Sequence, residues 1–365
     1  AYPEERNLWA QTYERAMTDV LVMYSEIAHD ISESLHIDLT SEEMIRLSNA
    51  RQVNPDAYEA YLKGMSHWYK LTPVNLETAR GYFESALEKD PNYALAHSGI
   101  ALVWVGLQQM GAVPPSEATP KAMEAVLKAQ ALDDTLAEVH YALALINTWS
   151  DWDWEGGEIS FKQALELNPN YPDARVYYSN LLCYLGHPDE ALAQGKRALE
   201  LDPLNSQFMG IYGLTLGMLG KNDEAIIQAR NAIKTSPNDP AGHSLLWEVF
   251  HIRGMYEEAL VEGKALFTGL GMAPLVEIMA QGYEKDGYSG AMRLVADTMA
   301  AFSQETFIPP WYIAYVYAFA SEKEQTLEWL EIAYEKKDPN LPYIGGEGVV
   351  TNFLHDDPRF QDLLR

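Results

Sequence analysis

The chain has 365 residues and a formal net charge of −27, so its surface is strongly acidic. This charge argues against direct nucleic-acid binding, which needs a positive surface, and equally disfavours an anionic membrane or an acidic target. A single cysteine, Cys183, excludes an internal disulfide framework and a cysteine-rich zinc site. No apolar run reaches eighteen residues, which predicts that no segment crosses a membrane.

Residues 1–53 do not repeat and predict an N-terminal helical segment. Between Leu8 and Ile45 the apolar residues follow a mixed helical spacing that fits an amphipathic helix of about five turns. The chain starts at Ala1, without a methionine and within sequence that already has this pattern. We therefore expect a piece of a longer protein.

From Asn54 onward the sequence repeats, and the period is clearest between residues 170 and 270. The landmarks recur every 34 residues and consist of a glycine, a small residue and a proline: Gly186, Gly220 and Gly254; Ala191, Ala225 and Ala259; Pro169, Pro203 and Pro237. Glycine permits a tight turn, proline stops a helix, and alanine allows two helices to approach closely. Each unit is thus predicted to be a pair of helices, and the pairs must stack to bury their apolar faces.

Eight such units account for residues 54–335. Their predicted limits are 54–91, 94–134, 137–169, 172–203, 206–237, 240–271, 272–303 and 307–335. Residues 336–365 are predicted to cap the last apolar face. The fold class is an all-α, right-handed superhelical solenoid of about eight helix pairs, with capping segments at both ends.

The 34-residue period and its landmarks resemble tetratricopeptide repeat (TPR) proteins, from about Asn54 to Tyr334. A narrower resemblance is carried by short motifs: Leu8-Trp9-Ala10-Gln11-Thr12-Tyr13-Glu14-Arg15, Ile27-Ala28-His29-Asp30-Ile31 and Asn54-Pro55-Asp56-Ala57-Tyr58. They look like the end of a TolB-like domain and its junction with TPRs. That resemblance implies a bacterial multidomain signalling or transcription-regulator protein, in which a winged-helix domain, kinase or cyclase lies upstream. The chain contains none of those effector domains, so no activity is carried over.

In a TPR superhelix the first helix of each pair lines an inner groove. The positions that face it give seven candidate ligand contacts: Tyr141, Trp149, Asn180, Tyr184, Met218, Glu248 and His251. The groove is aromatic, apolar and acidic, which favours a neutral to basic protein or peptide with apolar anchors. For Tyr141, Trp149, Asn180 and Tyr184, ordinary packing is the preferred interpretation and ligand contact is the alternative.

Other clusters favour structural roles. The tryptophans Trp149, Trp152 and Trp154 could form a stacking platform, but plugging the core between repeats is the preferred interpretation. The three histidines at the fourth repeat position, His97, His140 and His243, are expected in the core rather than on a metal. No phosphate loop, nucleophile elbow or metalloprotease motif is present, so neither catalytic residues nor a cofactor or metal are predicted.

The sequence predicts a non-catalytic scaffold that binds a protein or peptide, as the sensing or interaction part of a bacterial signalling protein. Two alternatives stay open: a module for homo-oligomerisation, such as a homodimer, or for structural spacing, and a small-molecule sensor. The compartment is also open, because a chain of this kind suits either the cytoplasm or the periplasmic side of a larger protein.

Overall fold

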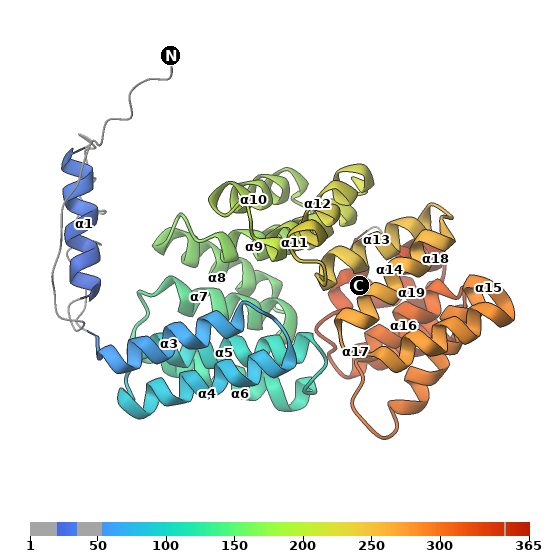
Figure 1. Cartoon of the computed structure of the whole chain (residues 1–365), viewed down its shortest axis with the longest axis horizontal. Helices are drawn as coiled ribbons and strands as arrows, with labels where there is room; N and C mark the ends of the chain where they lie inside the picture. The colour runs from blue at the N-terminus through green and yellow to red at the C-terminus, as the bar shows by residue number, and fades with distance from the viewer. Residues whose placement is uncertain (1–19, 35–52, 347) are drawn as a thin grey trace, which may run out of the picture.

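A computed structural model describes residues 20–34, 53–346 and 348–365, and every regular element in these ranges is a helix. Figure 1 shows the helices following one another as antiparallel pairs that wind into a superhelix, with α1 (Val20–Ser34) set apart from them. The predicted all-α solenoid is confirmed. Helix α1 is the described part of the helix expected between residues 8 and 45; the remainder of that range lies outside the described residues. None of the described helices has the length and apolarity to cross a membrane.

Helix bounds follow the repeat. The first four pairs are α3 (Pro55–Trp68) with α4 (Pro73–Lys89), α5 (Ala94–Gln109) with α6 (Pro115–Leu132), α7 (Ala137–Leu145) with α8 (Trp154–Leu167), and α9 (Pro172–Tyr184) with α10 (Pro188–Leu201). Then come α11 (Ser206–Met218) with α12 (Asn222–Thr235), α13 (Pro240–Ile252) with α14 (Tyr256–Gly269), α15 (Ala273–Phe302), and α16 (Pro310–Phe319) with α17 (Lys323–Glu335). Helix α15 contains a seventh pair, because the backbone leaves the helical region at Asp286 and Gly287.

The landmark glycines sit where each first helix ends. Gly186, Gly220 and Gly254 have φ values of +74°, +70° and +70°, a left-handed conformation that glycine adopts without a steric penalty. After Gly186, the backbone N–H of His187 bonds the carbonyl of Leu182 at 2.8 Å, which closes the turn into α10. The repeat period therefore reflects a backbone requirement.

The fourth repeat position has a local role that the sequence interpretation missed. There the side chain bonds the backbone carbonyl six residues earlier, at the end of the preceding helix pair: His97 to Pro91, His140 to Asp134, Arg175 to Pro169 and His243 to Pro237. The histidines are thus not simply core residues. They satisfy carbonyls that a terminating helix leaves without partners, as Arg175 does.

Close packing of α4 against α3 and α5 depends on glycine residues. Phe83 in α4 is fully buried between Gly64 of α3 and Gly99 of α5. A Cβ atom on Gly64 would lie 2.4 Å from the Phe83 ring, and one on Gly99 would lie 2.7 Å from it. The ring cannot retreat, because Ala79 and Ala86 beside it are also fully buried.

We expect Gly64→Ala to destabilise the protein by about 1–3 kcal/mol, because the added methyl group overpacks the site. Gly81, on the outer side of α4, is the matched control because a Cβ there meets nothing within 4 Å. Gly81→Ala is expected to stabilise by about 0.5–1 kcal/mol through helix propensity. Urea unfolding of both variants checks the pair, and an equal effect of the two would contradict this packing.

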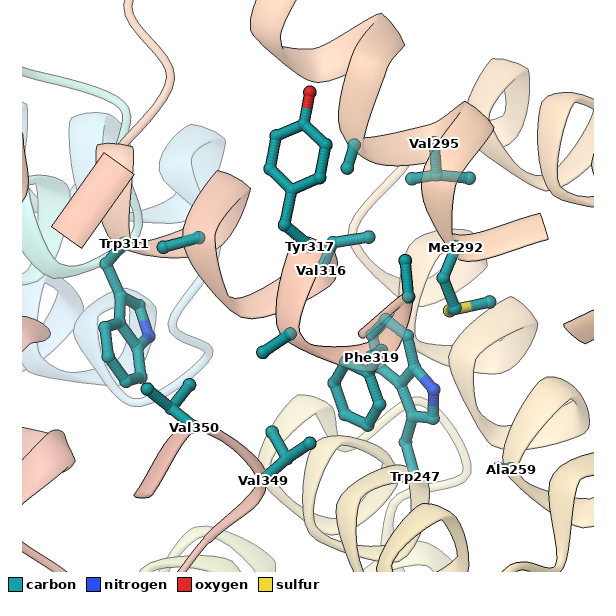
Figure 2. Close-up of a cluster of buried hydrophobic side chains, with 14 of the residues drawn as sticks. Trp247, Ala259, Met292, Val295, Trp311, Val316, Tyr317, Phe319, Val349 and Val350 are labelled. Atoms are coloured by element: carbon teal, nitrogen blue, oxygen red, sulfur yellow. The ribbon is translucent and has the colours of Figure 1, made fainter. Parts of the chain in front are cut away.

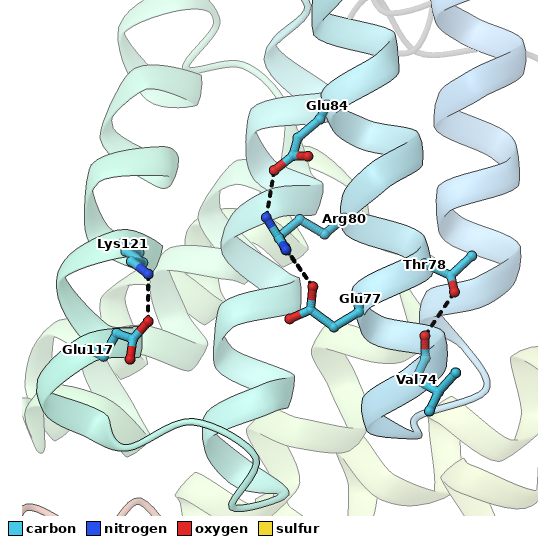
Figure 3. Close-up of polar contacts among 7 residues, drawn as sticks. All are labelled: Val74, Glu77, Thr78, Arg80, Glu84, Glu117 and Lys121. Atoms are coloured by element: carbon cyan, nitrogen blue, oxygen red, sulfur yellow. Dashed lines mark hydrogen bonds and ion pairs between the residues drawn. The ribbon is translucent and has the colours of Figure 1, made fainter.

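On the outer surface the helices carry ion pairs rather than apolar contacts. Figure 3 shows Arg80 between Glu77 and Glu84 on α4, and Lys121 with Glu117 on α6. These exposed pairs lie three or four residues apart, and each contributes only a few tenths of a kcal/mol. They leave the surplus of acidic side chains unneutralised.

The superhelix brings the last pair back to the second. The hydroxyl of Tyr312 in α16 donates to the carbonyl of Gln109, at the end of α5, over 2.9 Å, and the Asn340 amide donates to the same carbonyl. Gly111, at φ +69°, lies against Pro309. Residues more than 200 positions apart therefore hold the ends of the solenoid together (Figure 1).

Candidate peptide-binding groove

The C-terminal segment divides in two after Glu335. Helix α19 (Pro358–Leu363) packs on α17, and Arg359 forms ion pairs there with Glu331 and Glu324. Before it come η3 (Leu341–Gly345), which contacts α17, and α18 (Val349–Leu354), which lies on the inner helices α13 and α16. Figure 2 shows Val349 and Val350 beside the cluster around Trp247, Trp311 and Phe319.

Three of the seven predicted groove residues contact this segment. The ring of Tyr184 meets that of Tyr343 edge to face, with centroids 6.1 Å apart. Gly346 lies so close to Met218 that a Cβ atom on it would come within 2.8 Å. The Glu248 carboxylate accepts a hydrogen bond of 2.8 Å from the backbone N–H of Val349. The groove therefore holds the stretch of this chain where η3 ends and α18 begins, with extended backbone at Gly346 and Gly348.

Burial raises the pKa of Glu248, and the hydrogen bonds from Val349 and from the Tyr315 hydroxyl partly offset that effect. A carboxylate in such surroundings needs donors, because an unpaired charge away from water is costly. Glu248 thus marks the place where the groove accepts a backbone N–H.

Three other predicted residues, Tyr141, Trp149 and Asn180, face the interior and are at most 2% exposed. Tyr141 packs against Tyr171 and Tyr177, and the Asn180 amide donates to Thr215 at 2.7 Å. Trp149 lies in a π-helical turn, η2 (Ile146–Asp151), that widens the end of α7. All three are buried, so the sequence-based expectation of exposed groove contacts is wrong for them, although the buried Tyr141 hydroxyl has no hydrogen-bond partner.

His251, the seventh, is half-buried at the end of α13 among Tyr256, Tyr288 and Phe319. Burial lowers the pKa of His251 to about 4, so the ring is neutral at physiological pH. Its Nδ1 has no hydrogen-bond partner.

The three tryptophans of the 149–154 turn do not form one platform. Trp149 faces Tyr177, Trp152 faces Tyr334 and Trp154 faces Tyr184. Burial raises the pKa of the nearby Cys183 thiol to about 12, so it is protonated and unreactive at neutral pH. Among the described residues no three histidine, cysteine or acidic side chains gather as a metal site would require.

The seven candidate contacts left out two acids farther along the inner wall, although the repeat register places both at groove-facing positions. Asp173, the second residue of α9, is 4% exposed, and burial raises its pKa to about 7. Glu138, the second residue of α7, has a raised pKa for the same reason. Their common repeat position, one unit apart and next to Tyr171, is the sequence signal that could have identified them.

Comparisons with known proteins agree with this architecture. The sequence models of the tetratricopeptide repeat family match residues 160–193 and 179–240. By fold, the human IFIT1 dimer with m7Gppp-AAAA is similar, with a TM-score of 0.54, 16% identity, and coverage of 86% of this chain and 77% of that one. This likeness concerns the fold alone.

Two curated relatives match part of the sequence. A "Putative adenylate cyclase 3" of Rhizobium meliloti is 27% identical over 145 residues, which is 39% of this chain and 24% of that protein. The transcriptional regulator HilA of Salmonella typhimurium is 31% identical over 137 residues, or 38% and 25% respectively. The match therefore spans about a quarter of each relative's length.

Proposed function

We propose that this chain, a solenoid of helix pairs whose residues 160–240 match tetratricopeptide repeat models, is a non-catalytic scaffold that binds a protein or peptide in its inner groove. It would serve as the interaction part of a bacterial signalling or regulatory protein. The names of the two curated relatives, a cyclase and a transcriptional regulator, support that setting.

One observation carries the proposal: the groove already holds a segment of this chain, by the kinds of contact that a peptide would make. An aromatic ring lies on Tyr184, a glycine passes close to Met218, and a backbone N–H reaches Glu248. Extended peptides are recognised in this way, through main-chain hydrogen bonds and anchors for single side chains. A partner with these features would take the place of residues 343–349.

The partner we propose is neutral to basic, with an aromatic or apolar anchor. The chain's net charge of −27 attracts such a partner and repels nucleic acid. The groove carboxylates Glu138, Asp173 and Glu248 would repel acidic peptides.

Site-directed photocrosslinking in bacterial cells tests this proposal. A benzophenone amino acid at Tyr184 is expected to capture a specific protein, whereas the same group at Ile227, 56% exposed on the outer helix α12, should not. Identical adducts at both positions would contradict a groove-specific interaction.

A second experiment tests whether the partner displaces the C-terminal segment from the groove. In a Cys183→Ser background, Met218→Cys with Gly346→Cys lets a disulfide hold the segment in place after a shift of roughly 1 Å. We expect oxidation to reduce capture at Tyr184 at least fivefold and reduction to restore it. Capture that is unchanged by oxidation would mean that the partner binds elsewhere.

A further inference from the structure

Buried polar atoms without hydrogen-bond partners concentrate on one part of the inner wall. Of the ten such side chains among the described residues, eight lie between Tyr93 and Tyr184. They include the hydroxyls of Tyr93 and Tyr141 and one carboxylate oxygen of Asp173. Native interiors rarely leave such groups unpaired, so a local excess needs an explanation.

Two of the carboxylates there, Glu138 and Asp173, lie near each other. Asp173 and Glu138 occupy the same position of successive inner helices, and each lies near enough to raise the pKa of a neighbour: Glu138 and Asp202 both raise that of Asp173. No ion pair among the described residues involves Glu138 or Asp173. Asp173 is also near four tyrosines, because its charge helps to raise the pKa of each of them. A tyrosine side chain carries no positive charge, so none of the four can neutralise the carboxylate: Tyr69, Tyr141, Tyr171 and Tyr177.

Aromatic rings surround these acids. Tyr141 lies edge to face with Tyr171 at 5.2 Å between centroids, and Tyr93 lies in the same way against Tyr61 at 5.7 Å. Tyrosine faces attract cations, and the unpaired hydroxyls and carboxylate oxygen can accept hydrogen bonds from an ammonium group. Tyr69, whose pKa is raised by burial and by the nearby Asp173, is 45% exposed, so this group of residues extends to the surface.

We infer that Tyr93, Glu138, Tyr141, Tyr171 and Asp173 form an acid–tyrosine site that takes the ammonium group of a lysine side chain from the groove's partner. The inference rests on the proposed function, since it adds a specificity contact to the same groove. A compact ammonium group with three donors matches acceptors that converge from several directions. A metal ion does not fit, because the described residues hold no metal-ligating trio.

Calorimetry with small probes tests the site on the full chain. The probes are acetyl-Gly-Lys-Gly-amide, the same peptide with norleucine in place of lysine, and n-butylamine. Asp173→Asn removes the buried charge. Its matched control is Asp189→Asn, because Asp189 also follows a proline at the second residue of a helix, α10, but is exposed.

We expect the lysine peptide to bind at least tenfold more tightly than the norleucine peptide. Asp173→Asn should abolish that preference, and Asp189→Asn should leave it within twofold. Binding of the lysine peptide should strengthen severalfold from pH 6 to pH 8, as Asp173 loses its proton, whereas the norleucine peptide should show no such change.

Equal binding of the lysine and norleucine peptides, or an unchanged preference in Asp173→Asn, would overturn the acid–tyrosine site. Photocrosslinking at Tyr184 would still decide the scaffold proposal separately. Binding of n-butylamine as tight as that of the lysine peptide would overturn the assignment to a partner's lysine and assign the site to free amines.

Discussion

Trp247→Ala is expected to lower the free energy of unfolding by about 3–5 kcal/mol, the range for removing a large buried aromatic side chain. Trp247 is 1% exposed in α13 and stacks on Phe319 of α16, with centroids 4.3 Å apart and planes 3° from parallel. Its indole N–H donates to the Tyr288 hydroxyl at 2.9 Å. Figure 2 shows Trp247 stacked on Phe319. Together with the bond to Tyr288 in α15, this contact makes one side chain join helices of three successive repeats.

Urea unfolding followed by circular dichroism measures the effect. Trp154→Ala is the control, because Trp154 is 39% exposed at the start of α8, and we expect it to cost less than about 1 kcal/mol. Trp247→Phe should fall between the two, since it keeps the ring contact and loses the hydrogen bond. Similar losses for the Trp247 and Trp154 alanine variants would mean that the last repeats are not held through this contact.

Local chemistry explains why the repeats could be predicted. The turns require a positive φ at Gly186, Gly220 and Gly254, and that requirement appears in the sequence as a fixed period. The kink in α15 obeys the same rule at Gly287, with φ +61°. Where the backbone sets the residue type, a single sequence is informative.

The groove could be predicted only in part, because its contents are set by distant parts of the chain. Repeat register placed Tyr184, Met218 and Glu248 on the inner face. It could not indicate that Val349, 101 residues after Glu248, would bond it. Nor could it indicate the burial of Tyr141 and Asn180, which depends on neighbouring repeats. The repeat register therefore predicts which residues lie on the inner face of the solenoid, and the packing of neighbouring repeats determines which of those residues stay exposed.

Asp173→Asn is expected to stabilise the protein at pH 8, by about 2 kcal/mol. The pKa of Asp173 is raised from its ordinary value to about 7 in the folded state, first by burial and then by Asp202 and Glu138. The folded state therefore binds more protons than the unfolded one between about pH 4 and pH 7, and stability falls as pH rises through that window. The full shift corresponds to roughly 4 kcal/mol, and we expect about half because the asparagine amide also needs partners.

The measurement is the difference in urea-unfolding free energy between the variant and the wild type at pH 5, 6, 7 and 8. His251, whose folded pKa of about 4 makes the protein less stable as pH falls below about 6.5, is present in both chains and cancels in the difference. The gain should be small at pH 5 and reach its maximum at pH 8, and Asp189→Asn, at an exposed position, is measured beside it as the control. A loss of stability at pH 8 would mean that Asp173 is held by favourable contacts. A gain there, together with loss of lysine-peptide binding, would mean that a destabilising carboxylate is kept at this position for its ligand.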